Sequence, residues 1–268
     1  MAKKKNNSLE ASAKKSLKSF EAKQHVTDHR VAVRKKDNRL AIIVTAAVFV
    51  VALASQFLYF NVGPGVSSTA CITFTQTPAP QISGKPNPAQ VPDAAISECR
   101  DWTGSMTINN AKLDIVLHGK LAPQAVANFV DLSNLGFYKD NNCHRLTTSG
   151  IYVLQCGDTK GDGTGGPGYS FGPLENTPVA AQGAVPTYKK GWLAMARTSN
   201  SAVSMGSQFF IVYADSKIPS DAAGGYTVFG EITNGLAGLD PIIQAGAAGG
   251  KTDGAPKIKT SIKSITVK

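Results

Sequence analysis

The chain has 268 residues, of which 42% are hydrophobic and 17% are charged, a balance typical of a globular protein. Its formal net charge is +10, but residues 1–39 hold 12 Lys and Arg against 4 Asp and Glu, so most of the excess lies there. The rest of the chain is nearly neutral. The overall charge therefore describes a basic tail and argues against a nucleic-acid-binding role for the folded part.

The uncharged stretch at residues 40–60 predicts a single transmembrane helix. At about 1.5 Å of rise per residue it would span roughly 30 Å, the thickness of a bilayer's hydrocarbon core. Residues 34–39 hold four Lys and Arg, and no further basic residue follows until Lys85. The positive-inside rule then predicts that residues 1–39 are a cytoplasmic tail and that everything after the anchor lies outside the cytoplasm.

Three alternatives to an uncleaved anchor are open, one of which is a lipoprotein modified at Cys71, although Cys71 lies well past the apolar run and Ser68-Thr69-Ala70 before it lacks the usual leucine. Ala52-Leu53-Ala54 fits the small-x-small pattern of a signal-peptide cleavage site, and cleavage after Ala54 would also leave the C-terminal domain outside. A buried core helix is the third alternative, although such helices seldom run this long without a polar face. The long basic region and the apolar residues that resume at Phe57 favour the anchor.

Residues 61–101 are rich in Pro, Ser and Thr and predict an extended, extracytoplasmic linker. The folded domain is predicted at residues 102–268, and short apolar alternations dominate it. Residues 105–108 and 112–117 predict a strand pair, and Pro123 predicts the start of a helix. Further short strands and a second helix at residues 235–244 follow, so the domain is mainly β and the pattern predicts a closed or nearly closed barrel.

The four cysteines permit disulfides, because the predicted domain faces an oxidising space. Four cysteines allow three pairings, and Cys71 with Cys99 and Cys143 with Cys156 are preferred. The second pair would join two neighbouring strands. Two reduced, buried thiols are the alternative for that pair. No CxxC occurs, so a metal site is not expected.

Gly161-x-Gly163-x-x-Gly166 matches the dinucleotide fingerprint in letters only. The fingerprint requires a helix N-terminus immediately afterwards to receive the pyrophosphate. Pro167-Gly168 follows here, and no helical pattern does. These glycines are therefore interpreted as turn residues, and no nucleotide cofactor is predicted.

A set of short motifs resembles the cyclophilin family in its order and spacing, from about Gly104 to the C-terminus. The motifs are Cys143-His144-Arg145-Leu146, Leu154-Gln155-Cys156-Gly157-Asp158, Gly163–Tyr169, Leu193-Ala194-Met195-Ala196, Gly206-Ser207-Gln208-Phe209-Phe210-Ile211 and Tyr226-Thr227-Val228-Phe229-Gly230. The resemblance implies a closed antiparallel barrel of eight strands capped by two helices, in a membrane-anchored bacterial form. It also implies peptidyl-prolyl cis–trans isomerase activity without a cofactor.

The resemblance assigns Arg145 as the catalytic residue. The barrier to prolyl rotation is amide resonance, about 18–20 kcal/mol, and a cation that hydrogen-bonds the twisted amide favours the transition state selectively. Arginine suits this role because it stays charged and presents a rigid fork of donors. The substrate-binding positions that the family implies are Gln155, Tyr152, Val153, Ala196, Gln208, Phe210, Ile218 and Tyr226. Alternation predicts that Phe209 and Phe210 face opposite sides of their strand.

Several positions depart from the family's pattern. The segment between Arg145 and Gln155 is two residues longer than usual, which leaves Tyr152 and Val153 as the candidates for the pocket's apolar pair. Ile218 stands where many members carry tryptophan, and Tyr226 replaces a histidine. Arg197 replaces an asparagine, and a second cation there would make acidic or phosphorylated ligands conceivable.

The function predicted from these residues is isomerisation of Xaa-Pro bonds in secreted or cell-surface proteins. A binding or holdase module that uses the same groove without turnover is the main alternative, and a scaffold barrel that carries a functional basic tail is a third possibility. The expected partners are proline-containing segments of client proteins and the membrane, with no nucleic acid, and the chain is expected to be a monomer at the cell membrane.

Overall fold

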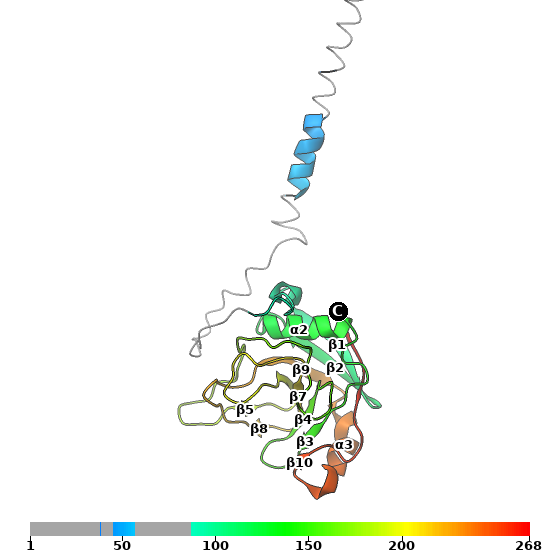
Figure 1. Cartoon of the computed structure of the whole chain (residues 1–268), viewed down its shortest axis with the longest axis vertical. Helices are drawn as coiled ribbons and strands as arrows, with labels where there is room; N and C mark the ends of the chain where they lie inside the picture. The colour runs from blue at the N-terminus through cyan, green and yellow to red at the C-terminus, as the bar shows by residue number, and fades with distance from the viewer. Residues whose placement is uncertain (1–37, 39–44, 57–86) are drawn as a thin grey trace, which may run out of the picture. The chain divides into compact units, whose positions relative to one another are not determined.

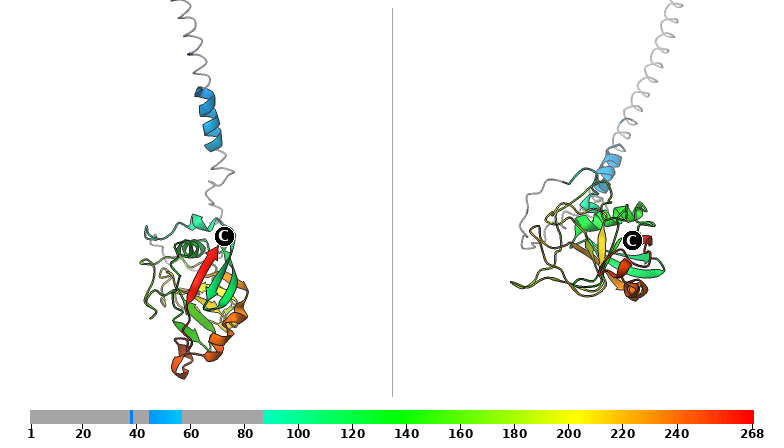
Figure 2. Two further views of the ribbon diagram at one scale, coloured as in Figure 1. Left: turned by 90° about the vertical axis from the view of Figure 1, so that its right-hand side faces the viewer. Right: turned by 60° about the horizontal axis from the view of Figure 1, so that its bottom comes forward.

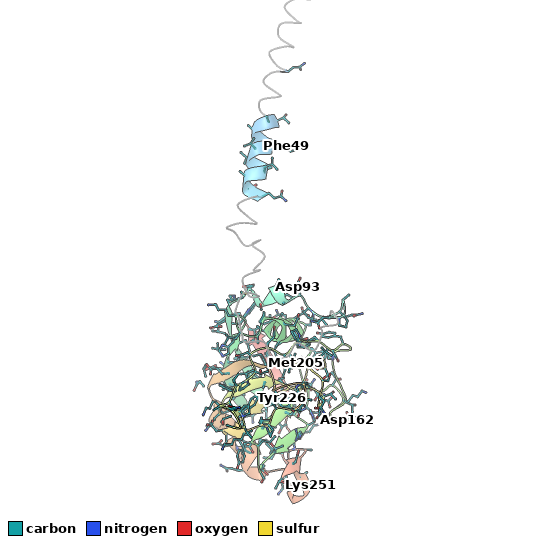
Figure 3. The ribbon with its side chains drawn as sticks, turned by 90° about the vertical axis from the view of Figure 1, so that its left-hand side faces the viewer. Phe49, Asp93, Asp162, Met205, Tyr226 and Lys251 are labelled. Carbon is teal, nitrogen blue, oxygen red and sulfur yellow. A yellow bond between two sulfur atoms is a disulfide. The ribbon has the colours of Figure 1, made fainter. Side chains whose placement is uncertain are left out.

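The computed structural model describes residue 38, residues 45–56 and residues 87–268, and it divides the chain into two compact units, 1–67 and 68–268. Residues 45–56 form a helix, and its apolar side chains, such as Phe49, are exposed (Figures 1 and 3). Within these described stretches, no helix has the length and apolarity needed to cross a membrane. The predicted span 40–60 extends past the described helix at both ends, so it stays a prediction.

The second unit is built on one curled, antiparallel sheet of nine strands. In spatial order the strands are β10 (Asp253–Gly254), β3 (Arg145–Thr147), β4 (Val153–Cys156), β7 (Phe209–Val212), β6 (Trp192–Met195), β9 (Val228–Asn234), β2 (Ala111–His118), β1 (Asp101–Ile108) and β11 (Ile262–Val267). The last strand thus lies beside the first, as Figure 2 shows. A separate two-stranded sheet pairs β5 (Thr187–Tyr188) with β8 (Ser216–Lys217).

The described residues form a curled, nine-stranded antiparallel sheet, so the mainly β, barrel-like prediction holds, while full closure as an eight-stranded barrel stays a prediction. The edges of the sheet are β10 and β11, and no ladder joins them in the described part of the chain. Instead, a few isolated backbone hydrogen bonds join the segment before β3 to the start of β11. One of them runs from the Cys143 N–H to the Thr260 carbonyl. These bonds surround one isolated antiparallel bridge, Asn142 with Ser261, and do not extend into a ladder.

Within residues 87–268, two α-helices accompany the sheet, with three short 3-10 turns, η2 (Ala94–Ser97), η3 (Leu236–Leu239) and η4 (Ala248–Gly250). The first helix, α2 (Pro123–Asn134), begins at a proline, whose fixed φ suits the first helical turn. The second, α3 (Asp240–Ala245), follows η3 directly and also carries its proline in the first turn. Both predicted helices are therefore present, and Pro241 starts the second one rather than breaking it.

Buried apolar side chains form two clusters on opposite faces of the sheet. The larger one packs Phe129 of α2 against Phe209 and Phe229, with ring centroids 5.4 and 5.0 Å apart. The smaller one contains Phe210, Val153 and neighbours on the other face. Phe209 and Phe210 thus point to opposite sides, as the alternation predicts.

Residues 87–100, which the sequence places in the linker, lie against the sheet domain. Asn87 donates to the Gly172 carbonyl at 2.8 Å and accepts from the Gly172 N–H at 3.0 Å. Gln124 on α2 donates to the Pro92 carbonyl at 2.8 Å. The segment is therefore held by hydrogen bonds between side-chain amides and backbone groups. The composition of a proline-rich stretch does not reveal such bonds.

Candidate active site

Arg145 begins β3 and is held by two partners. Its Nε and Nη2 donate to the two carboxylate oxygens of Asp253 at 2.8 and 2.7 Å, and its Nη1 donates to Gln155 Oε1 at 3.4 Å. The bond to Asp253 raises the pKa of the guanidinium and lowers the pKa of the carboxyl, so both groups are charged at neutral pH. The site therefore presents a fixed cation, as the predicted role of Arg145 requires.

The two glutamines extend this arrangement into a directed chain of hydrogen bonds. Gln155 Nε2 donates to Gln208 Oε1 at 2.9 Å, and Gln208 Nε2 donates to the carbonyls of Gly163 and Gly165 at 2.9 and 2.8 Å. Each amide uses its oxygen on one side and its nitrogen on the other, so the orientation of both is determined. The glycine-rich loop thus anchors the side chains that orient Arg145.

Asp158 organises the glycine-rich loop from within. Its carboxylate accepts the Lys160 N–H at 3.0 Å and the Gly163 N–H at 2.5 Å. Burial alone would raise the pKa of Asp158, but these backbone donors lower it overall, so the carboxylate is charged. No helix follows the loop, which agrees with the interpretation of its glycines as turn residues.

The apolar floor of the site is the smaller cluster. Phe210 lies opposite Gln155 in the ladder between β4 and β7 and is 5% exposed. Its ring meets Tyr226 edge to face, with centroids 5.4 Å apart, and Ile218 packs in the same cluster. Tyr226 is labelled in Figure 3. The structure therefore brings Phe210, Ile218 and Tyr226 together, as the resemblance implies.

The structure separates the two candidates in the lengthened segment. Val153 has its side chain on the same face as Gln155 and packs in the Phe210 cluster. Tyr152 lies on the opposite face, where it packs against the larger cluster and meets Tyr213 with centroids 6.0 Å apart. Tyr152 is therefore not brought to the site. Ile151, which the sequence analysis did not select, packs beside the Phe210 cluster instead.

A groove of about 950 Å³ runs beside this floor. Gln155, Gln208 and Ala196 line it, together with the glycine-rich loop at residues 163–168. Ala196 also packs against the Phe210 cluster, so it joins the apolar floor to the polar groove. The arrangement can hold an extended peptide backbone while an apolar ring rests on the floor.

Arg197 does not supply the second free cation that the sequence suggested. Its side chain is 1% exposed and makes a bidentate pair with Asp221, at 2.8 and 2.9 Å. The guanidinium lies 4.7 Å from the centroid of the Tyr226 ring, so it braces that wall of the site. A buried, paired arginine has no charge left for an acidic ligand, and this corrects the expectation.

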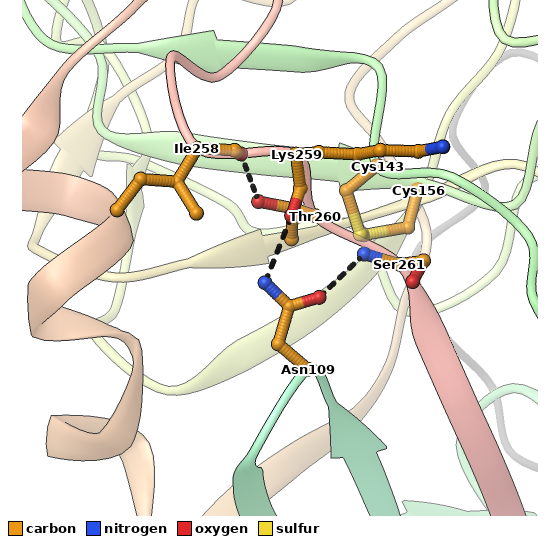
Figure 4. The surroundings of a disulfide bond; sticks show 7 residues. All are labelled: Asn109, Cys143, Cys156, Ile258, Lys259, Thr260 and Ser261. Carbon is orange, nitrogen blue, oxygen red and sulfur yellow. Dashed lines mark hydrogen bonds between the residues drawn. A yellow bond between two sulfur atoms is a disulfide. The ribbon is translucent and has the colours of Figure 1, made fainter.

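The disulfide between Cys143 and Cys156 is present and joins the segment before β3 to the end of β4 (Figure 4). These strands carry Arg145 and Gln155, so the crosslink lies beside the hydrogen-bonded pair. Asn109 holds the neighbouring segment, residues 259–261, by donating to the Lys259 carbonyl and accepting from the Ser261 N–H, both at 3.0 Å. The predicted partner Cys71 lies outside the described residues, so the pairing of Cys71 with Cys99 stays a prediction.

Sequence reasoning missed two groups that complete the site. Asp253 lies 108 residues after Arg145 and contacts it only because β10 pairs with β3. Tyr188 is fully buried under the floor, where its hydroxyl accepts the Tyr226 N–H at 2.7 Å. No local pattern marks either residue, because each acts through a contact between distant segments.

Comparison with known proteins shows the family to which the sheet domain belongs. The family model described as cyclophilin type peptidyl-prolyl cis-trans isomerase/CLD matches residues 104–267. A probable peptidyl-prolyl cis-trans isomerase B of Mycobacterium tuberculosis is 45% identical over 175 residues, which cover 60% of this chain and 53% of that protein. The corresponding protein of Mycobacterium leprae is 42% identical, over 61% of this chain and 56% of its own length. The chain thus spans about half the length of these relatives.

A shorter relative and a solved structure extend the comparison. Peptidyl-prolyl cis-trans isomerase B of Bacillus subtilis is 38% identical over 126 residues, covering 47% of this chain and 78% of that protein. The crystal structure of a cyclophilin type isomerase from Cryptosporidium parvum superposes with a TM-score of 0.52 at 27% identity. The superposition covers 63% of this chain and 98% of that one.

Proposed function

Because the chain belongs to the cyclophilin-type peptidyl-prolyl cis–trans isomerase family, we propose that it catalyses rotation about Xaa-Pro peptide bonds. The observation that carries the proposal is the placement of Arg145. A guanidinium has five N–H donors, and three of those of Arg145 are engaged by Asp253 and Gln155. One N–H on each terminal nitrogen is left to meet a substrate beside the groove.

Each residue of the site has a separate role in the proposed reaction. The proline ring rests on Phe210, while Gln208 and Gln155 line the groove that takes the peptide backbone. Arg145 donates to the amide as it twists and loses resonance, and this interaction is stronger at the twisted geometry than in either planar isomer. No bond is made or broken, so positioning and a fixed positive charge suffice. A dipeptide Ala-Pro accompanies one solved structure of the Cryptosporidium parvum protein, which supports an Xaa-Pro ligand.

The test measures isomerisation of a proline-containing peptide by the full chain in detergent micelles, with Arg145→Lys and Arg145→Ala beside it. Arg145→Lys keeps the charge but loses the fork, and we expect turnover to fall by about 10²-fold, the usual loss for one transition-state donor. A wild-type chain that leaves the uncatalysed rate unchanged would end the proposal. Peptide binding that survives in Arg145→Ala, together with an inactive wild type, would favour the binding-only alternative.

The proposal includes a location and a class of client. Residues 40–60 anchor the chain in the cell membrane, the part of the predicted linker that precedes Asn87 acts as an extracytoplasmic spacer, and the sheet domain lies outside the cytoplasm. There it assists the folding of secreted or cell-surface proteins, whose proline isomerisation takes tens to hundreds of seconds unaided. The support is the asymmetry of basic residues around the apolar stretch. Reporter fusions at residue 30 and residue 268 test it, and a cytoplasmic signal from the C-terminal fusion would reject it.

A further inference from the structure

The bond between Arg145 and Asp253 is more specific than a surface ion pair needs to be. The two side chains are 40% and 52% exposed, so solvent screens much of their Coulomb attraction and the charges alone stabilise the fold little. Yet both carboxylate oxygens are engaged, by Nε and Nη2, in the parallel fork that fixes the plane of the guanidinium. An arrangement that stabilises little but orients strictly indicates a role in the site.

The backbone of Asp253 is held independently of its side chain. β10 pairs with β3, so Asp253 faces Thr147 in the ladder. On one side the Thr252 carbonyl accepts the Thr148 N–H at 2.8 Å, and on the other the Ala255 carbonyl accepts the Ala248 N–H at 2.8 Å. A change of the carboxylate alone therefore leaves the main-chain bonds of this segment in place.

Asp253 and Gln155 together hold Arg145 from two directions. Asp253 accepts one hydrogen bond from Nε and one from Nη2, and Gln155 accepts one hydrogen bond from Nη1. One hydrogen of Nη1 and one hydrogen of Nη2 are then left without either of these two partners. Loss of the carboxylate would free rotation about the outer bonds of the side chain, because Gln155 alone holds it with a bond of 3.4 Å.

We propose that Asp253 is a positioning residue for isomerisation, which acts by holding the guanidinium of Arg145 with its two terminal N–H groups presented to the rotating amide. The inference rests on the proposed function. It assigns part of the catalytic arrangement to a C-terminal segment outside the motifs that identify the family. It also predicts that Asp253 affects turnover more than peptide affinity, since the orientation matters most at the twisted geometry.

The test compares Asp253→Asn with a matched control in the full chain. Asparagine keeps the size and one acceptor but cannot accept both N–H groups as a charged fork. Asp140→Asn is the control. It also removes an exposed ion pair, the one with Lys263 at 3.2 Å, and it changes the net charge by the same amount. We expect Asp253→Asn to lower kcat by about tenfold with less than a twofold change in KM, and Asp140→Asn to leave both unchanged.

A double-variant cycle separates positioning from a structural effect. Lysine at position 145 cannot form the fork, so Asp253→Asn should change kcat by less than twofold in an Arg145→Lys background. The Arg145 Nε–H signal in an NMR spectrum should exchange slowly with water in the wild type and rapidly in Asp253→Asn. An equal loss of kcat in both backgrounds, or a kcat that rises in Asp253→Asn, would overturn the inference.

The failure of this inference is distinct from failure of the proposed function. An inactive wild type would reject isomerisation and with it the role of Asp253. An active wild type whose kcat is unchanged by Asp253→Asn would reject the role of Asp253 alone.

Discussion

Replacing Arg197 with methionine should destabilise the fold more than any exposed charge change. The five donors of Arg197 are all used: two on Asp221, and the others on the carbonyls of Thr198, Gly224 and Gly225. Breaking a buried ion pair by removing one partner costs about 3–5 kcal/mol, because the other charge is left without compensation. Asp221 is 27% exposed and keeps the N–H groups of Asn200 and Ala223, so a loss of about 3 kcal/mol is expected.

Denaturant unfolding of the full chain in detergent micelles, followed by the fluorescence of Trp102 and Trp192, measures this loss. Lys263→Met is the control, because its pair with Asp140 is exposed and should contribute less than about 1 kcal/mol. KM for a proline peptide should also rise, since Arg197 braces the Tyr226 ring. A loss below 1 kcal/mol, equal to that of the control, would refute the reasoning.

The same variant has a pH dependence of definite sign. The hydrogen bond from Arg197 holds the pKa of Asp221 well below its usual range. A depressed pKa contributes stability that is present above the unfolded value of about 3.9 and is lost as pH falls towards the folded value. The stability gap between wild type and Arg197→Met should therefore narrow below about pH 4. A gap that stays constant down to pH 3 would contradict the assignment of Asp221 as the charged partner.

Two further predictions concern Glu175 and the disulfide. Glu175 accepts the N–H groups of Gln124 and Ala125 at the start of α2, and burial raises its pKa to about 7. A carboxyl whose folded pKa is raised contributes stability that is present below its unfolded pKa and is lost as pH rises through the folded value of about 7. The free energy of unfolding of the wild type should therefore fall between pH 5 and 8. The free energy of unfolding of Glu175→Gln should not fall for this reason. Parallel pH profiles would refute this. Replacing Cys143 and Cys156 together by alanine opens a loop of sequence separation 13 and should cost about 3 kcal/mol, measured by denaturant unfolding without reductant. A loss under 1 kcal/mol would show that the disulfide hardly restricts the unfolded chain.

Much of the site could be predicted from the sequence, because the residues concerned lie on regular strands or in ordered motifs. Alternation along β7 placed Phe209 and Phe210 on opposite faces, since the side chains of a strand have a strict period of two. The same period selects Val153 over Tyr152 once the register of β4 against β7 is known. The sequence could not supply that register, because the lengthened segment before β4 left the count ambiguous.

The sequence by itself determined the composition of the domain, its strand-rich pattern, its two helices and the family to which it belongs. Only the tertiary structure decided which charges are free. Arg145 and Arg197 have the same side chain, yet one lies half-buried beside the groove while the other is enclosed and fully paired. Their partners, Asp253 and Asp221, come from segments 108 and 24 residues away, and a linear pattern carries no information about such contacts.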